Sequence, residues 1–150
     1  MPVVCDFIQI IGDGPVTIGD ANTLFEASFN TGGRYGVTGV ASAAFLIFNV
    51  RGLTHANEDV VVSVNGVEIG TIGHYFPGGP GVNTNDIDDP NKLRHRLHWY
   101  TQLIALTGSQ LNDGNNQLRI EAVRFPGNTG GNTFDDFQLK DMMCFFHQNA

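Results

Sequence analysis

Residues 60–70, with the sequence VVVSVNGVEIG, constrain the fold of this chain most strongly. Val60, Val62 and Val64 share one face of an extended segment, because side chains alternate between the two faces of a strand. The Asn65-Gly66 pair that follows readily adopts the two positive φ angles of a type I′ turn. We therefore predict a β-hairpin over residues 60–70.

The same two-residue period recurs elsewhere along the chain. Residues 3–8 and 118–123 alternate as strands, and residues 43–51 (AAFLIFNVR) are apolar on both faces, which is typical of a central strand. Residues 99–106 also fit a strand. Just before them, Asp89-Pro90 has the form of a helix N-cap followed by proline, so one short helix is expected there.

The last apolar segment, residues 137–147, contains a break in its pattern. Phe137 and Leu139 point to one face, but Asp141 falls at the next position of that same face. A buried carboxylate needs a partner, and a β-bulge would turn it outward. We expect one of these two solutions at Asp141.

The length of 150 residues matches a single domain, and the 19 glycines indicate many tight turns. About eight short strands joined by such turns, with at most one short helix, are typical of an all-β sandwich. We predict one domain over residues 1–150, folded as a β-sandwich jelly roll of about eight antiparallel strands.

The formal net charge of −7 repels phosphate backbones and anionic lipids, so we expect no nucleic-acid partner. No apolar run reaches the roughly 18 residues that span a bilayer, so membrane insertion is not expected. The N-terminal residues MPVVCDFIQI do not resemble a signal peptide. The localisation stays open between the cytoplasm and a mature extracellular form.

Cys5 and Cys144 lie near opposite ends of the sequence. A disulfide between them would require the first and last strands to be neighbours. Two reduced, buried thiols that pack as small apolar side chains are the favoured interpretation.

Several motifs occur in an order that resembles a known superfamily. An apolar strand ends in FNVRG and is followed by VSVNGVEIG, HWYTQLIAL, LNDGNNQLRIEA and TFDDFQLKDM. This arrangement, over residues 45–145, is similar to the galactose-binding-domain-like jelly roll of carbohydrate-binding modules and lectins. The matching positions are Leu111, Gly114, Asn116, Leu118, Ile120, Asp135, Asp136, Phe137 and Leu139.

These motifs set turn geometry, so the resemblance implies the fold more than the function. Members of the superfamily include sugar binders, calcium-dependent binders and structural modules.

Sugar binding needs flat aromatic faces beside polar groups, and residues 73–100 contain both. Tyr75 lies among loop residues and is the preferred stacking side chain. Trp99 is a second candidate, although the only tryptophan of a small domain also fits a core position. The candidate ligand-binding residues are His74, Tyr75, Asn83, Asn85, Arg94 and Trp99.

Calcium prefers six to eight oxygen ligands, and the loop carries a cluster of oxygen-bearing side chains. The cluster lacks the spacing of an EF-hand. Asp136 lies at a second position, which the resemblance associates with structural calcium, and a solvated acidic turn is the alternative there. The candidate calcium ligands are Asp86, Asp88 and Asp136.

Enzymatic motifs are missing from the sequence. There is no nucleophile elbow, phosphate-binding loop or zinc-binding histidine motif. Our leading hypothesis is a non-catalytic, lectin-like carbohydrate-binding domain in which calcium is an optional cofactor, and which forms a homo-oligomer. The alternative is a self-assembling coat, fibre or adhesion subunit, and a small glycan-active hydrolase or lyase is a third hypothesis.

Overall fold

The computed structural model describes residues 5–33, 44–53, 59–73, 98–106, 110–124 and 134–147. Over these ranges the chain forms nine strands and no helix. The expected short helix lies outside the described residues. The strands are β1 (Cys5–Ile11), β2 (Val16–Ile18), β3 (Leu24–Asn30), β4 (Ala44–Arg51), β5 (Val60–Val64), β6 (Val67–Ile72), β7 (Tyr100–Leu106), β8 (Asn115–Glu121) and β9 (Phe137–His147).

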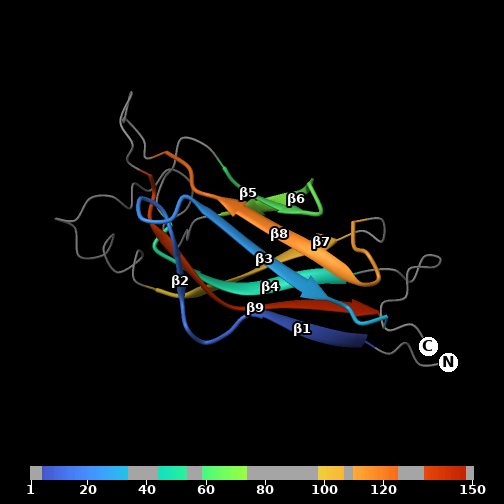
Figure 1. Ribbon diagram of the computed structural model, residues 1–150. Helices are drawn as coiled ribbons and strands as arrows, with labels where there is room; N and C mark the ends of the chain where they lie inside the picture. The colour runs from blue at the N-terminus through green and yellow to red at the C-terminus, as the bar shows by residue number, and fades with distance from the viewer. Residues whose placement is uncertain are drawn as a thin grey trace.

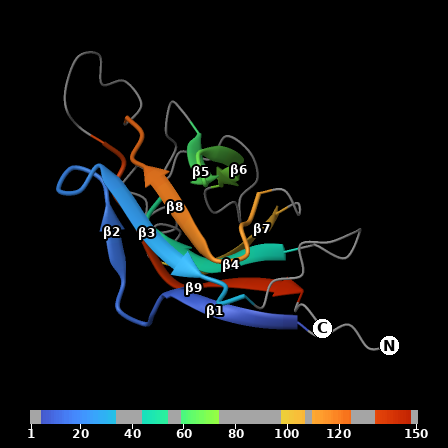
Figure 2. The same cartoon turned by 45° about the vertical axis from the view of Figure 1, so that its right-hand side comes forward.

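The strands form two antiparallel sheets that pack face to face (Figures 1 and 2). Sheet A has the order β1-β9-β4-β7, with β2 also paired to β9, and sheet B has the order β3-β8-β5-β6. This arrangement confirms the predicted all-β sandwich. In the described ranges no helix is long and apolar enough to cross a membrane.

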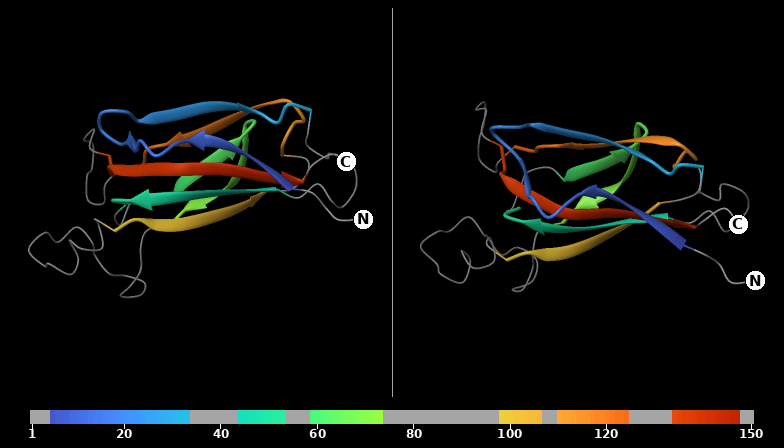
Figure 3. Two further views of the ribbon diagram at one scale, coloured as in Figure 1. Left: turned by 90° about the horizontal axis from the view of Figure 1, so that it is seen from below. Right: turned by 60° about the horizontal axis from the view of Figure 1, so that its bottom comes forward.

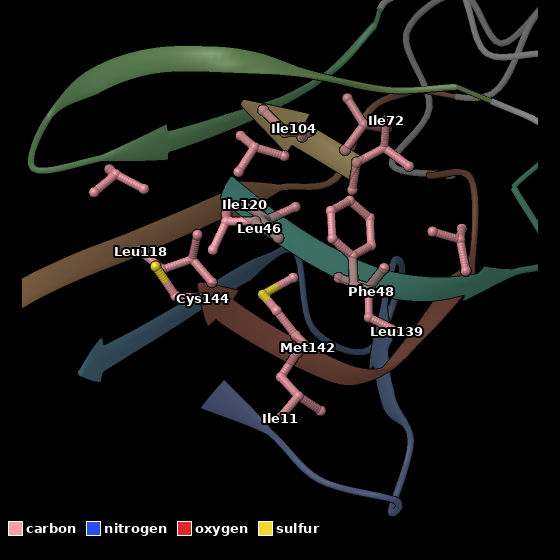
Figure 4. Close-up of a cluster of buried hydrophobic side chains, with 14 of the residues drawn as sticks. Ile11, Leu46, Phe48, Ile72, Ile104, Leu118, Ile120, Leu139, Met142 and Cys144 are labelled. Atoms are coloured by element: carbon pink, nitrogen blue, oxygen red, sulfur yellow. The ribbon is translucent and has the colours of Figure 1, made fainter. Parts of the chain in front are cut away.

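The hydrophobic core fills the space between the sheets (Figure 4). Every second residue of β4 points into it, including Leu46, Phe48 and Val50. Leu118 and Ile120 of β8 face them from sheet B. The outward side chains of the two strands differ: those of β8 are mostly exposed, whereas those of β4 are half-buried. The outward side chains of β4, a central strand of sheet A, are thus more closely packed than those of β8.

The predicted hairpin is confirmed as β5 and β6, with φ angles of 53° at Asn65 and 79° at Gly66. The Asn65 side chain does more than form the turn. Its Nδ2 donates to the Asn116 Oδ1 at 2.8 Å and to the Gln110 carbonyl at 2.9 Å. Its Oδ1 accepts the Gln117 N–H at 2.9 Å. The two asparagine-containing motifs therefore join the hairpin turn to the segment that enters β8.

Asp141 lies at a β-bulge, which is one of the two solutions that its position predicted. It has a φ of 52°, and the register between β4 and β9 shifts beside it. Its N–H donates to the Gly12 carbonyl at 2.8 Å, and its Oδ2 accepts Asn49 Nδ2 at 3.2 Å. Because the bulge inserts one residue, Lys140 and Met143 both lie on the outer face.

Cys5 and Cys144 are free thiols although β1 and β9 are neighbours. Cys144 is buried in the core, and burial raises the pKa of its thiol to about 12. Cys5 is exposed, so the prediction that both thiols are buried is wrong for Cys5. It pairs with His147, three residues beyond Cys144, and the alternation of strand side chains places the two thiols on opposite faces.

Candidate functional site

The sequence-predicted site residues fall mostly in the segment 74–97, which lies outside the described residues. His74, Tyr75, Asn83, Asn85, Asp86, Asp88 and Arg94 belong to it. Of the predicted site residues, only Trp99 and Asp136 belong to the described part of the chain, and the two lie in separate regions of it. Trp99 precedes β7 on sheet A, whereas Asp136 precedes β9 at a turn contact with Asp20.

Trp99 lies on the outer face of sheet A. The register that pairs Val50 with Tyr100 places Trp99 beside Arg51, which points away from the buried Val50. The Arg51 Cζ is 4.5 Å and the Lys140 Nζ 4.6 Å from the centre of the indole ring. Trp99 is half-buried, so it is a surface side chain held by two cations and does not belong to the core.

Polar side chains of β4, β7 and β9 complete this site. Arg51 Nε donates to Gln138 Oε1 at 3.0 Å, and Thr101 Oγ1 donates to Asn49 Oδ1 at 2.7 Å. Lys140 Nζ lies 4.0 Å from Asp141 Oδ2, the atom that also accepts from Asn49. We call this set the Trp99 cluster, and its members are Asn49, Arg51, Trp99, Thr101, Gln138, Lys140 and Asp141.

The Trp99 cluster carries two cations against one carboxylate, in a chain whose net charge is −7. The hydrogen-bonded partner of Arg51 is the neutral Gln138. By contrast, Arg119 on sheet B lies 3.6 Å from Glu26 and 3.9 Å from Glu121. The cluster therefore combines an aromatic surface, amide groups and cations held in fixed positions, which are the groups that recognise sugar hydroxyls and ring C–H faces.

Sequence reasoning named Trp99 as a candidate but did not name the side chains that surround it. Arg51 and Lys140 are 89 residues apart, and pairing between β4 and β9 brings them together. The available signal was strand alternation, because both residues occupy outward positions next to buried ones in their segments.

Asp136 stabilises a turn contact. Its Oδ1 accepts the Asp20 N–H at 2.7 Å, and the Asp20 Oδ1 accepts the Phe134 N–H at 2.7 Å. A Cβ on Gly19 would lie 1.7 Å from Asp136 Oδ1, so the contact depends on glycine at that position. Among the described residues no group of three or more His, Cys, Asp or Glu side chains could hold a metal ion.

A separate pocket of about 280 Å³ lies where β5 begins and β8 ends. Its lining includes two carboxylates, from Asp59 and Glu121, beside Arg124. The Glu121 side chain is 67% exposed and lies 3.9 Å from Arg119. This is the environment of a solvated ion pair, whereas a catalytic carboxylate is usually shielded from water.

No family model matches this chain. No curated protein matches it by sequence either. Its fold does match solved structures. Latent PorU from Porphyromonas gingivalis aligns over 100% of this chain and 13% of its own, at 10% identity and a TM-score of 0.60. The β-porphyranase BpGH86A from Bacteroides plebeius aligns over 99% of this chain and 21% of its own, at 12% identity and a TM-score of 0.50.

A family 35 carbohydrate binding module from Clostridium thermocellum covers 93% of this chain and 97% of its own, at 15% identity and a TM-score of 0.45. The chain spans only about an eighth of PorU and about a fifth of the β-porphyranase. At these identities the likeness concerns architecture alone. The described part of the chain thus has the all-β sandwich fold that its sequence motifs led us to expect.

Proposed function

We propose that this chain is a non-catalytic carbohydrate-binding domain and that the Trp99 cluster contacts the sugar. The observation that carries the proposal is that Trp99 lies outside the core. The centre of its ring is 4.5 Å from Arg51 Cζ and 4.6 Å from Lys140 Nζ. An aromatic ring whose orientation is already fixed loses little conformational entropy when a ligand binds. One protein that shares the fold, BpGH86A, is a glycoside hydrolase, which supports carbohydrate as the ligand class.

The residues divide into two roles. The accessible part of the Trp99 ring contacts the C–H groups of a sugar ring. Arg51, Gln138 and Asn49 supply donors and acceptors for hydroxyl groups, and all three lie on the outer positions of neighbouring strands. Because β4 and β9 are paired along their length, the spacing of these groups is rigid.

Further ligand contacts are proposed from the segment before Trp99, on sequence grounds. They come from His74, Tyr75, Asn83, Asn85 and Arg94. Calcium, with Asp86, Asp88 and Asp136 as ligands, is the proposed optional cofactor.

A glycan array, followed by calorimetric titration of the best ligand, tests this proposal. Trp99→Ala should weaken sugar binding by at least about ten-fold, because truncating a central aromatic contact typically costs more than 1 kcal/mol. Arg51→Ala should also weaken binding. Arg119→Ala is the matched control, since it removes an arginine from the opposite sheet. If folded wild-type protein binds no glycan, or if Trp99→Ala binds as wild type does, the proposal is wrong.

A further inference from the structure

Figure 3 shows that β1, β9, β4 and β7 lie side by side in sheet A. Next to the Trp99 cluster, the outer face of these strands carries two rows of mostly apolar side chains. Phe7, Phe145 and Phe45 are consecutive partners across β1, β9 and β4. In the next row, Met143, Ile47 and Leu103 are partners across β9, β4 and β7. We call this surface the apolar stripe, and its members are Phe7, Phe45, Ile47, Leu103, Met143 and Phe145.

The apolar stripe is ordered but accessible to solvent. The ring centres of Phe7 and Phe145 are 5.5 Å apart, and those of Phe45 and Phe145 are 5.0 Å apart. At the two sides of the sheet, Phe7 is 54% and Leu103 55% exposed. The two remaining positions in these rows are Gln9 and Ala105, so the surface contains no charged residue.

The outer face of sheet B provides a contrast within the same molecule. There Glu26 pairs with Arg119 across β3 and β8, and Ser28 Oγ donates to Gln117 Oε1 at 2.7 Å. These polar pairs are what a water-facing sheet surface normally carries. A contiguous apolar surface on the other side of the sandwich indicates an interaction site.

A pocket of about 210 Å³ lies at one end of the apolar stripe. It is lined by Cys5, Phe45, Phe145, Phe146 and His147. Its volume is several times the roughly 30 Å³ of a water molecule, which leaves room for an apolar side chain. The same face of the molecule thus presents a protruding leucine, Leu103, and an apolar pocket that can receive one.

We propose that the apolar stripe is the interface of a homodimer, with a second copy of this chain as its occupant. A symmetric dimer requires a self-complementary surface, and a protrusion and a pocket on one face meet that requirement. A two-fold axis in the plane of the interface, passing between Leu103 and the pocket, places Leu103 of each copy against the pocket of its partner. The apolar stripe holds no charged residue, so contact through it adds no local repulsion between two chains of net charge −7.

The two rows of the apolar stripe set a lower limit on the contact area. Four strands about 4.8 Å apart and about four residues at about 3.3 Å each give a planar footprint of about 250 Å². The accessible area is larger than the footprint because side chains protrude from the sheet. Specific interfaces begin at about 600 Å² of accessible surface per partner, so the proposed contact also includes residues that border the stripe, among them those that line the pocket.

Sedimentation velocity over a concentration series tests the dimer. We expect wild-type protein to be dimeric at about 100 µM, and Leu103→Asp and Phe7→Asp each to weaken the dimer at least about ten-fold by burying an unpaired charge. Val67→Asp is the matched control. Val67 is an exposed apolar residue, 50% accessible, but it lies in β6 of sheet B and should not affect association.

Thermal unfolding and circular dichroism of each variant establish that the sheet is intact, which is expected because both residues are about half exposed. A wild-type chain that stays monomeric at about 100 µM would overturn the proposal. A dimer that survives both substitutions would do the same. Sugar binding by the Phe7→Asp monomer, and dimerisation of Trp99→Ala, are separate readouts that distinguish failure of this interface from failure of the proposed function.

Discussion

Replacing Asn116 with alanine should cost this domain a large part of its stability. Asn116 is only 1% exposed, and its side chain takes part in four hydrogen bonds. Its Oδ1 accepts from Asn65 Nδ2 at 2.8 Å and from the Asn112 N–H at 2.7 Å. Its Nδ2 donates to the carbonyls of Asn112 and Gly114 at 3.0 Å and 3.1 Å.

The size of the stability loss depends on which hydrogen bonds the partners of Asn116 keep in the variant. Asn65 Nδ2 still donates to the Gln110 carbonyl, and the Gly114 carbonyl still accepts the Thr31 N–H at 2.9 Å. The Asn112 N–H loses its acceptor, but Asn112 is an exposed residue, so water can replace that bond and its net loss is about 1 kcal/mol. Adding about 0.5 kcal/mol for each of the other three bonds gives a loss of about 2.5 kcal/mol in the free energy of unfolding.

Urea denaturation of the wild type and of two variants provides the measurement. Asn115→Ala is the control, since Asn115 is the preceding residue, is exposed, and contributes only its backbone carbonyl to this turn. It should change stability by less than about 0.5 kcal/mol. If Asn116→Ala costs less than about 1 kcal/mol, or no more than Asn115→Ala, the network does not stabilise the fold as we argue.

Two further predictions test other parts of the structure. Gly19→Ala should destabilise the domain by about 2 kcal/mol or more in thermal or urea unfolding, because the added Cβ would lie 1.7 Å from Asp136 Oδ1. Gly12→Ala is the control and should be tolerated, because its Cβ would meet nothing closer than 3.6 Å. Burial raises the pKa of Cys144 from 9.0 to about 12. Between these two pH values the folded state keeps a proton that the unfolded state loses. The free energy of unfolding should therefore fall by up to about 1.4 kcal/mol per pH unit between pH 9 and pH 12. The pKa of Tyr100 is also raised, mainly by burial and then by the nearby Asp135 charge. Cys144→Ala should therefore make the free energy of unfolding less dependent on pH without removing the dependence. An unchanged pH dependence would refute the assignment to Cys144.

Local patterns predicted most of the individual elements. The Asn65-Gly66 turn and the strand at β4 follow from steric preferences within a few residues. The irregularity at Asp141 was visible for the same reason, because a single polar residue interrupted an apolar face. The resemblance in the Asn116 motif also identified the fold, although the hydrogen bonds made by Asn116 are apparent only in the structure.

The sequence by itself determined the all-β class, the hairpin, the irregularity at Asp141 and the candidacy of Trp99, since each depends on neighbours within one segment. Only the tertiary structure decided that β9 lies between β1 and β4. That pairing brings Arg51 and Lys140 to Trp99 and aligns the apolar stripe, and its register places Cys5 and Cys144 on opposite faces of the sheet. Strand order depends on contacts between residues far apart in the chain, and the period of a single strand carries no information about which strand will be its neighbour.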